Sequence, residues 1–116
     1  MQKSILITGC SSGIGLDCAT TLHAQGWKVF ASCRQQKDCD KLAKMGLEAP
    51  RLDHSDTLSI SKAIDCITEQ TGGTLDAIFN NGAFAVPGAV EDLPTDALRS
   101  IYETNVFGYH EVIRQV

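Results

Sequence analysis

Short apolar runs alternate with helix-like segments along the chain, and this alternation constrains the fold more than any other feature. Strand-like runs occupy residues 4–8, 27–33, 47–52 and 75–80, and helical spacing or capping marks residues 13–25, 37–45, 57–70 and 95–116. Strands and helices that alternate through short turns predict a parallel sheet built from right-handed crossovers. The pattern stops after the fourth strand and inside a helix, so we expect one incomplete doubly wound α/β domain over residues 1–116.

Polar caps and glycines predict where the helices begin and end. Asp56 and Thr95 are the expected N-caps of the third and last helices. Gly46 and Gly72 are expected to end the second and third helices, because glycine tolerates the left-handed conformation of a helix terminus. Residues 81–94 carry neither pattern, so we expect an irregular connection there.

Composition excludes several classes of protein. Of the 116 residues, 43% are hydrophobic and 21% are charged, which fits a globular protein and excludes intrinsic disorder. The net charge is −4 and no basic block occurs, so we expect neither nucleic acid nor an anionic membrane as a partner. No apolar run approaches the roughly 18 residues that span a bilayer, and the N-terminus lacks a signal-peptide pattern. We therefore expect a cytoplasmic protein.

The cysteines predict neither a disulfide framework nor a metal site. There are five of them, Cys10, Cys18, Cys33, Cys39 and Cys66. An odd count in a chain without a secretion signal argues against a set of disulfides. No pair has the C-x-x-C spacing of a zinc site, so we expect reduced, structural thiols and no bound metal.

A glycine-rich turn, Thr-Gly-Cys-Ser-Ser-Gly-Ile-Gly at residues 8–15, joins the first strand to the first helix. Glycines let the backbone turn tightly and allow a pyrophosphate to approach, and the following helix offers free N–H groups. The G-x-G-x-x-G spacing is not matched because residue 18 is Cys18, and no Gly-Lys-Ser/Thr of a P-loop occurs. The turn favours a dinucleotide site; a strand–helix turn without a ligand is the alternative.

These eight residues resemble the cofactor turn Thr-Gly-x-x-x-Gly-x-Gly of the short-chain dehydrogenase/reductase family, in its compact single-domain branch. Four further places match the family: the Arg34 region, Leu52-Asp53, Asn80-Asn81 and Asn105, so the resemblance covers the whole chain. It implies a Rossmann-like doubly wound parallel sheet in the strand order 3-2-1-4, truncated after about four strands. It also implies that six residues surround the pyrophosphate and the adenosine ribose: Gly9, Ser11, Ser12, Gly13, Ile14 and Gly15.

The end of the second strand indicates which nicotinamide cofactor is preferred. An NAD site has a carboxylate there, whereas an NADP site has a cation for the 2′-phosphate. In the family pattern the acidic residue falls at Cys33, and Arg34 follows as a bidentate phosphate partner. Lys37 adds a second cation. We expect NADP (NADPH) to be preferred over NAD; the alternative is that Arg34 is an ordinary solvated residue.

Two residues after the third expected strand are candidate cofactor contacts. The resemblance implies that Asp53 accepts a hydrogen bond from the adenine amino group and that the backbone of His54 also contacts the cofactor. Helix capping in competition with Asp56 is the alternative for Asp53. The family has an aliphatic residue where His54 stands, and we expect its side chain to be solvated and to carry no chemistry.

The end of the fourth expected strand holds two more candidate cofactor contacts, Asn81 and Gly82. The family sequence is Asn-Asn-Ala-Gly, and its last two residues are reversed here to Gly82-Ala83. Both orders let the backbone approach the nicotinamide-side ribose. One of the two asparagines is expected to tie this strand to Thr8.

The last helix carries an apolar stripe at i, i+3, i+4 spacing that includes Leu98, Tyr102 and Val112 and is interrupted by Asn105. By the resemblance, Asn105 bends the helix and holds a water of the proton relay, which makes it the one candidate catalytic residue. A structural Asn satisfied by backbone groups is the alternative. The family commonly pairs through this helix, so we expect a homo-oligomer.

The acid–base residues of the family are not in this chain. The family uses a Ser and a Tyr-x-x-x-Lys pair, but Tyr102 and Tyr109 are followed at the fourth position by Val106 and Ile113. The prediction is therefore the NADP-binding N-terminal portion of an oxidoreductase that interconverts a carbonyl and an alcohol on a small molecule. A non-catalytic nucleotide-binding or regulatory module and a non-functional truncated remnant are the alternatives.

Overall fold

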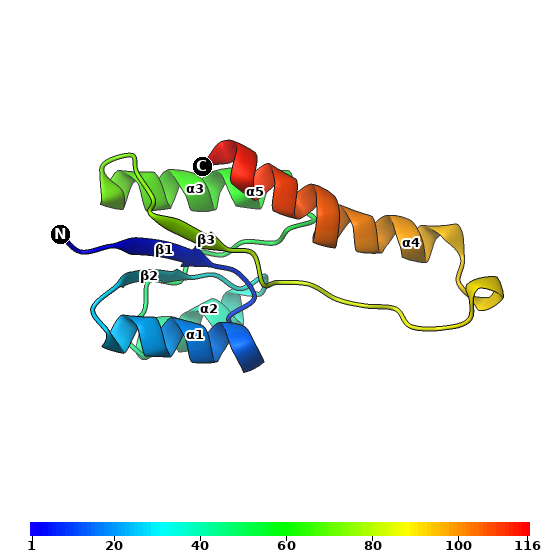
Figure 1. Cartoon of the computed structure of the whole chain (residues 1–116), viewed down its shortest axis with the longest axis horizontal. Helices are drawn as coiled ribbons and strands as arrows, with labels where there is room; N and C mark the ends of the chain where they lie inside the picture. The colour runs from blue at the N-terminus through cyan, green and yellow to red at the C-terminus, as the bar shows by residue number, and fades with distance from the viewer.

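The computed structural model describes all 116 residues as a parallel sheet with helices on both faces (Figure 1). In chain order the elements are β1 (Ser4–Ile7), α1 (Gly13–Ala24), β2 (Lys28–Ala31), α2 (Gln36–Lys44), α3 (Thr57–Thr71), β3 (Ala77–Phe79), the 3₁₀ turn η1 (Val90–Asp92), α4 (Thr95–Tyr102), the π-helical segment η2 (Glu103–Gly108) and α5 (Tyr109–Gln115). The expected Rossmann-like α/β fold is confirmed.

The three strands run in the order β2-β1-β3. In the parallel registers, Leu6 of β1 lies opposite Phe30 of β2 on one side and Ile78 of β3 on the other. The strand predicted at residues 47–52 is not continuous: the segment makes two isolated parallel bridges to Phe30 and Cys33, beyond β2. Its place agrees with the expected order 3-2-1-4, but Pro50 has no N–H to donate and interrupts the ladder.

Alternation along the strands divides the core into two layers. Ile5 and Ile7 belong to the layer under α1 and α2, whereas Leu6 and Phe30 belong to the layer under α3 and α5. Successive strand residues point to opposite faces of a sheet, so each face carries its own apolar set. Figure 1 shows the same arrangement, with α1 and α2 on one side of the strands and α3 and α5 on the other.

The predicted caps are correct at one helix and wrong at another. The carboxylate of Asp56 accepts hydrogen bonds from the N–H groups of Leu58 and Ser59 at the start of α3, and Gly72 ends that helix in the left-handed conformation at φ 73°. At α4 the N-cap is Pro94, not Thr95. Pro94 is extended, and Thr95 is already the first helical residue, so its hydroxyl is not placed to cap.

The last helix changes its winding in the middle. Residues 103–108 form a π-helical segment between α4 and α5, which is where Asn105 was expected to bend the helix. Of the predicted apolar stripe only Val112 is buried, in the layer under α3, while Leu98 and Tyr102 stay exposed. Figure 1 shows α4 and the connection before it extending away from the sheet.

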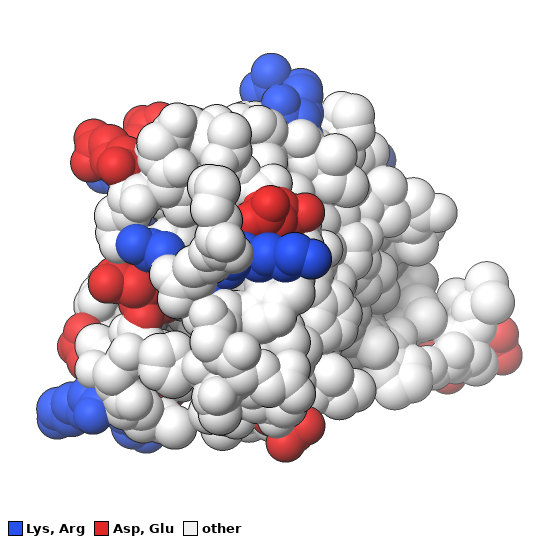
Figure 2. Space-filling view, turned by 60° about the vertical axis from the view of Figure 1, so that its left-hand side comes forward, with Lys and Arg blue, Asp and Glu red and all other residues white.

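The surface carries charges of both signs. On the face drawn in Figure 2, Lys and Arg side chains alternate with Asp and Glu side chains, without a basic patch on that face. No helix combines the length and the apolar character needed to cross a bilayer. All five cysteines are free thiols.

Candidate functional site

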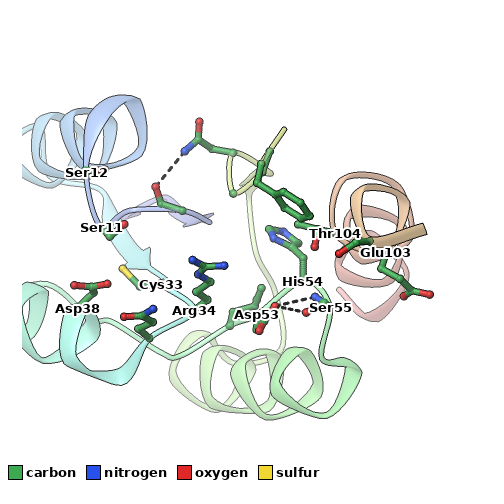
Figure 3. Close-up of a pocket in the computed structure, with 18 of the residues that line it drawn as sticks. Ser11, Ser12, Cys33, Arg34, Asp38, Asp53, His54, Ser55, Glu103 and Thr104 are labelled. Carbon is green, nitrogen blue, oxygen red and sulfur yellow. Dashed lines mark hydrogen bonds between the residues drawn. The ribbon is translucent and has the colours of Figure 1, made fainter. Parts of the chain in front are cut away.

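A cleft of about 790 Å³ opens where β1, β2 and β3 end (Figure 3). Ligands of open α/β sheets bind at this carboxyl edge. Eight of the residues proposed from the sequence line the cleft: Gly9, Ser11, Ser12, Arg34, Asp53, His54, Asn81 and Gly82. The cleft lining does not include Gly13, Ile14, Gly15 or Asn105.

The glycine turn is held in backbone contact with two neighbours. Gly9 has φ +68°, and a Cβ on it would lie 2.6 Å from the Cα of Gly82. Gly15, in the first turn of α1, is so close to the Gly9 carbonyl that a Cβ there would overlap with the oxygen. These approaches require glycine and bring the start of α1 and the end of β3 onto the same edge of the cleft.

The start of α1 keeps its backbone donors available. Ser12 is the N-cap, and its side chain makes no capping hydrogen bond. Ser11 and Ser12 are exposed, and both line the cleft (Figure 3). The first N–H groups of a helix have no intrahelical partner, and the positive end of the dipole lies with them. An anionic group can therefore bind here without displacing a side chain.

The hydroxyl of Thr8 links the end of β1 to the end of β3 through two hydrogen bonds. The Oγ1 of Thr8 accepts hydrogen bonds from the N–H groups of Asn81 (2.9 Å) and Gly82 (3.0 Å). The side-chain amide of Asn81 donates to the carbonyl of Gly9 at 3.2 Å. The predicted tie between an asparagine and Thr8 is confirmed, and it fixes the two turns that form the floor of the cleft.

Arg34 presents a free cation to the cleft. Its side chain is exposed, projects into the cleft in Figure 3, and makes no hydrogen bond or ion pair within the chain. Lys37 also lines the cleft. The preceding Cys33 is buried, and burial, with a contribution from Cys39, raises the pKa of its thiol to about 12. The position thus carries no negative charge that would repel a phosphate.

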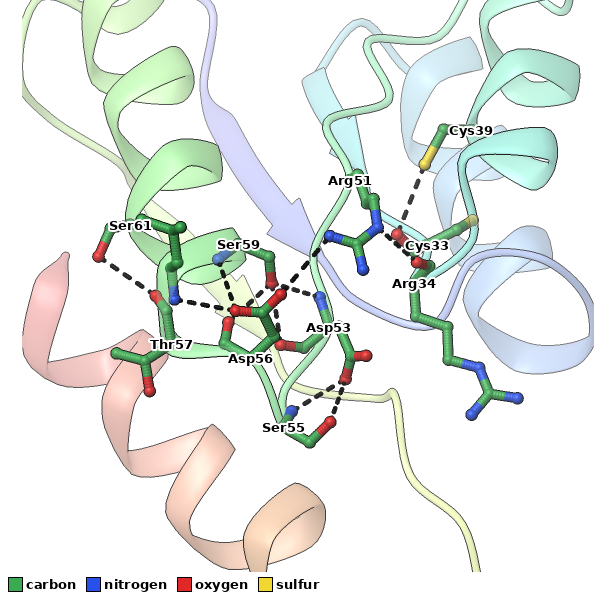
Figure 4. Close-up of polar contacts among 11 residues, drawn as sticks. Cys33, Arg34, Cys39, Arg51, Asp53, Ser55, Asp56, Thr57, Ser59 and Ser61 are labelled. Atoms are coloured by element: carbon green, nitrogen blue, oxygen red, sulfur yellow. Dashed lines mark hydrogen bonds and ion pairs between the residues drawn. The ribbon is translucent and has the colours of Figure 1, made fainter.

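Arg51, which the sequence reading missed, holds the backbone of Arg34 (Figure 4). Its Nε donates to the Arg34 carbonyl at 2.8 Å, and its guanidinium lies 3.8 Å from the carboxylate of Asp56. The hydrogen bond to the Arg34 carbonyl forms because the isolated parallel bridge between Cys33 and Arg51 places Arg51 beside Arg34. The sequence shows a basic residue, Arg51, near the end of the expected third strand. Its hydrogen bond to the Arg34 carbonyl, however, depends on how this segment is aligned with β2, which the sequence does not show.

Asp53 lies at the same edge and forms a local turn rather than a helix cap. Its Oδ1 accepts from the N–H (2.9 Å) and the hydroxyl (2.7 Å) of Ser55. The cap of α3 is Asp56, so the capping alternative for Asp53 is wrong. Burial raises the pKa of Asp53, but the Ser55 hydrogen bonds and the nearby arginines outweigh it and leave the pKa below its ordinary value. The carboxylate is ionised and available to accept.

His54 departs most from expectation. It was expected to be solvated, but its exposed fraction is 7%. Its ring lies 3.2 Å from the side-chain oxygen of Asn80 and has its centroid 4.9 Å from that of Tyr109. Burial lowers its pKa, although Asn80 and Asp53 act in the opposite direction. The sequence reading missed this because the contact joins residues 54, 80 and 109, which no local pattern relates.

Asn105 is engaged by the irregular connection before α4. Its side-chain amide donates to the carbonyl of Phe84 at 2.8 Å and accepts from the N–H of Phe84 at 3.3 Å. This pairing is what the structural alternative expects. Asn105 does not line the cleft, but its neighbour Thr104 and its partner Phe84 do.

The polar face of the last helix forms one wall of the cleft. Ser100, Glu103 and Thr104 line it, at spacings of three and four residues that place them on one helical face. The sequence reading followed the apolar stripe and did not consider this face, although its periodicity was visible. The structure holds no group of three or more His, Cys, Asp or Glu side chains arranged for a metal ion.

Known proteins share this fold and much of this sequence. The family model described as short chain dehydrogenase matches residues 3–116. The chain is 38% identical over 112 residues to the uncharacterized oxidoreductase YbbO of Escherichia coli (strain K12), covering 97% of this chain and 42% of that protein.

Solved structures agree. A short-chain dehydrogenase from Streptomyces avermitilis matches with a TM-score of 0.91 and 30% identity, over 99% of this chain and 42% of that one. An NADPH-bound carbonyl reductase from chicken fatty liver matches with a TM-score of 0.89 and 26% identity, over 98% of this chain and 50% of that one. The chain thus spans about two-fifths to one-half of the proteins it matches, and it belongs to the short-chain dehydrogenase family.

Proposed function

We propose that this chain is the NADP-binding portion of an oxidoreductase that interconverts a carbonyl and an alcohol by hydride transfer. The observation that carries the proposal is the unpartnered guanidinium of Arg34, which faces a cleft at the carboxyl edge of a parallel sheet. One structural neighbour is an NADPH-bound carbonyl reductase, which supports both the cofactor and the reaction.

Each part of the cleft has a role in this proposal. Gly9, Ser11 and Ser12 of the glycine turn line the cleft, and together with the first N–H groups of α1, at Gly13, Ile14 and Gly15, they hold the pyrophosphate, because free N–H groups and the helix dipole favour anions. Arg34 and Lys37 hold the 2′-phosphate, because guanidinium binds phosphate in a bidentate way. Asp53, with the His54 backbone beside it, accepts from the adenine amino group.

The nicotinamide side of the cleft is formed by Asn81 and Gly82. Their backbone is held by Thr8 and lines the cleft, so a ribose can contact it there. The bound nicotinamide supplies or accepts the hydride. We assign Asn105 to the same end of the site as the candidate catalytic residue, because π-helical turns such as residues 103–108 occur frequently at functional sites.

The chain offers no general acid for the carbonyl oxygen. Tyr109 packs against His54, and burial raises the pKa of its hydroxyl, which disfavours ionisation. Neither tyrosine has a lysine four residues later. A positioned acid contributes roughly 10²–10⁴-fold to such a step, so we propose that the Ser and the Tyr-Lys pair belong to sequence beyond residue 116.

Cofactor preference gives the direct test. We expect NADPH to bind more tightly than NADH, and the double substitution Arg34→Leu with Cys33→Asp to reverse the order. Each lost charge-assisted contact is worth roughly 1.5–3 kcal/mol. The matched control is Arg99→Leu, an exposed arginine on α4 outside the cleft. Equal affinities for the two cofactors before and after the swap would contradict the proposal.

Turnover separates the enzyme portion from a purely nucleotide-binding module. The 116-residue chain should reduce no aldehyde or ketone with NADPH, while a protein extended through the downstream reading frame should do so. A Gly13→Asp variant, which places a carboxylate at the phosphate turn, is the blank for both proteins. Turnover by the 116-residue chain above that blank would contradict the proposal that this chain binds the cofactor while the acid–base residues lie beyond residue 116. Binding without turnover in the extended protein would favour the non-catalytic module.

We also propose that two copies associate through the last helix. Leu98 and Phe107 are each 54% exposed and line a small hollow with Tyr102. Apolar patches of this kind mark association surfaces in soluble proteins.

A further inference from the structure

Two of the positions at which the sequence departs from the family pattern, 54 and 82, are in contact with each other. A Cβ on Gly82 would lie 3.0 Å from Cε1 and 3.1 Å from Nδ1 of the His54 ring. Gly82 is not among the glycines with positive φ, so its backbone conformation would accept an alanine. The closest neighbour of that Cβ position is the imidazole, and the backbone nitrogen of Gly9 follows at 3.3 Å, so space rather than the backbone angle makes glycine the fitting residue at position 82.

His54 also joins three segments that are distant in the sequence. Its Nε2–H donates to the side-chain oxygen of Asn80 at 3.2 Å, because that oxygen can only accept. The ring packs against Tyr109 of α5. The backbone of His54 lies so close to Gly108 that a Cβ there would overlap with the His54 carbonyl oxygen. The loop after α2, the end of β3 and the last helix thus meet at one side chain.

Gly82, the partner of His54 in this contact, is also part of the floor of the cleft. Gly82 donates to the hydroxyl of Thr8, and a Cβ on Gly9 would overlap with the Gly82 Cα. A displacement of Gly82 must therefore move the glycine turn or break the bond to Thr8. The position of the His54 ring decides how far Gly82 can lie from the turn that faces the pyrophosphate.

We propose that His54 and Gly82 form a matched pair in which His54 is a positioning residue for the dinucleotide. The ring takes the volume that a methyl group at position 82 would need, and its hydrogen bond to Asn80 holds the Asn80–Gly82 turn against the glycine turn. This inference rests on the proposed function, because the ligand it concerns is NADP(H).

The pair also makes dinucleotide binding depend on the protonation of one imidazole. The charged and titratable groups around it are Asp53 on its own loop and Tyr109 on α5, and the turn at residues 80–82 contributes none. Burial favours the neutral ring, which donates through Nε2 while Nδ1 lies beside Gly82. A second proton would add charge at Nδ1, next to the turn that must stay in place.

A double-mutant cycle tests the pairing. The four proteins are the wild type, His54→Val, Gly82→Ala and the double variant, and both the NADPH dissociation constant and the urea midpoint are measured for each. We expect Gly82→Ala alone to weaken NADPH binding about tenfold, because the methyl group meets the ring. The double variant should recover most of that loss, since contacting residues show couplings of this size.

Matched controls separate the pair from general effects of the substitutions. Gly88→Ala places a methyl group 3.2 Å from the flexible side chain of Leu93, outside the cleft, and His54→Val should not alter its effect. His23→Val removes an exposed histidine of α1 and should leave NADPH binding unchanged.

The pH profile supplies a readout that a purely structural role would not move. The ratio of wild-type to double-variant affinity cancels the titration of the ligand itself. We expect this ratio to fall severalfold at acid pH, below the ordinary imidazole pKa of about 6.5, because burial lowers the pKa of His54 and protonation of the ring requires a lower pH. A ratio independent of pH would overturn the positioning role.

The outcomes distinguish the two proposals. Wild-type binding of NADPH with additive effects in the cycle overturns the matched pair and leaves the proposed function standing. Failure of the wild type to bind NADPH or NADH overturns the proposed function and the positioning role with it. In that case the urea midpoints of the same four proteins still decide whether residues 54 and 82 are coupled.

Discussion

The sheet region and the last 36 residues of the chain are packed very differently. Across residues 1–80 the apolar side chains of β1 and β2 are covered on both faces, and Leu6 and Phe30 are fully buried. Across residues 81–116 only Gly108 and Val112 are buried, whereas Phe107 is 54% and Ile113 is 61% exposed. The cleft lies at the junction, so a well-packed region supplies its floor and a loosely covered helix supplies its wall.

The largest expected effect is a difference in stability between two phenylalanine-to-alanine variants, one in the sheet region and one in the last helix. Phe30→Ala should cost about 3–5 kcal/mol of the free energy of unfolding, because it opens a cavity in the layer under α3. Phe107→Ala should stay within about 0.5 kcal/mol, since its ring is already half in solvent. Urea unfolding measures both. A comparable cost at the two positions would mean that the last helix is as well packed as the sheet.

The close contact inside the glycine turn gives the next effect. Gly15→Ala should cost about 1–3 kcal/mol, because the added methyl group meets the Gly9 carbonyl, which is backbone and cannot rotate away. Gly88→Ala, where the neighbour is the side chain of Leu93, is the matched control and should cost less. Thermal melts of the two variants at one pH compare them. A smaller loss at Gly15 than at Gly88 would show that the turn can relax.

The exposed apolar side chains of the last helix predict that the chain associates with itself. Leu98→Lys and Phe107→Lys should each weaken association of the chain about tenfold, or about 1.4 kcal/mol, because each removes one of the three apolar side chains of the hollow along α4 and η2 and puts a charge in its place. Met45→Lys, at an equally exposed apolar residue at the end of α2, should leave association unchanged. Sedimentation equilibrium provides the measurement. A monodisperse wild-type monomer would contradict association through the last helix.

The smallest effect concerns pH. The pKa of Asp53 is lowered in the folded chain, so its contribution to stability is present above about pH 4 and is lost as the pH falls further. Asp53→Asn should therefore be less stable than the wild type near neutral pH, by roughly 0.5–1 kcal/mol because the carboxylate is partly exposed to solvent. Once the pH falls below the lowered pKa of the folded state, the two should converge.

The control for this pH effect is Asp65→Asn, at an exposed aspartate of α3 that accepts no hydrogen bond at its carboxylate. It should shift stability little at either pH. A gap between wild type and Asp53→Asn that stays constant down to acid pH would assign the effect to packing rather than to charge.

Local patterns predicted most of the sheet region, because strand runs, capping residues and glycine turns are encoded over a few neighbouring positions. The Asp56 cap is an example, whereas the tie between Thr8 and the end of β3 spans more than 70 residues and was expected only from the family resemblance. The continuous third strand was wrong because one proline removes a ladder donor, and the Thr95 cap was wrong because Pro94 takes that position. His54 and Arg51 could not be placed, since their partners are 26 and 17 residues away.

The π-helical segment at residues 103–108 sets the phase between α4 and α5. One residue corresponds to about 100° of rotation in an α-helix, so a wider turn offsets every side chain after it relative to those before. That offset lets Val112 face α3 while Asn105 faces Phe84 across the irregular connection. The wide turn takes up about one residue more than an α-helical turn, so a deletion of one residue within this segment would let the helix run on regularly and keep the buried face of α5 toward the core. A deletion within α5 itself, before Val112, would instead rotate that face by about 100°. The π-helical turn thus allows the chain to change in length by one residue without a loss of helical phase.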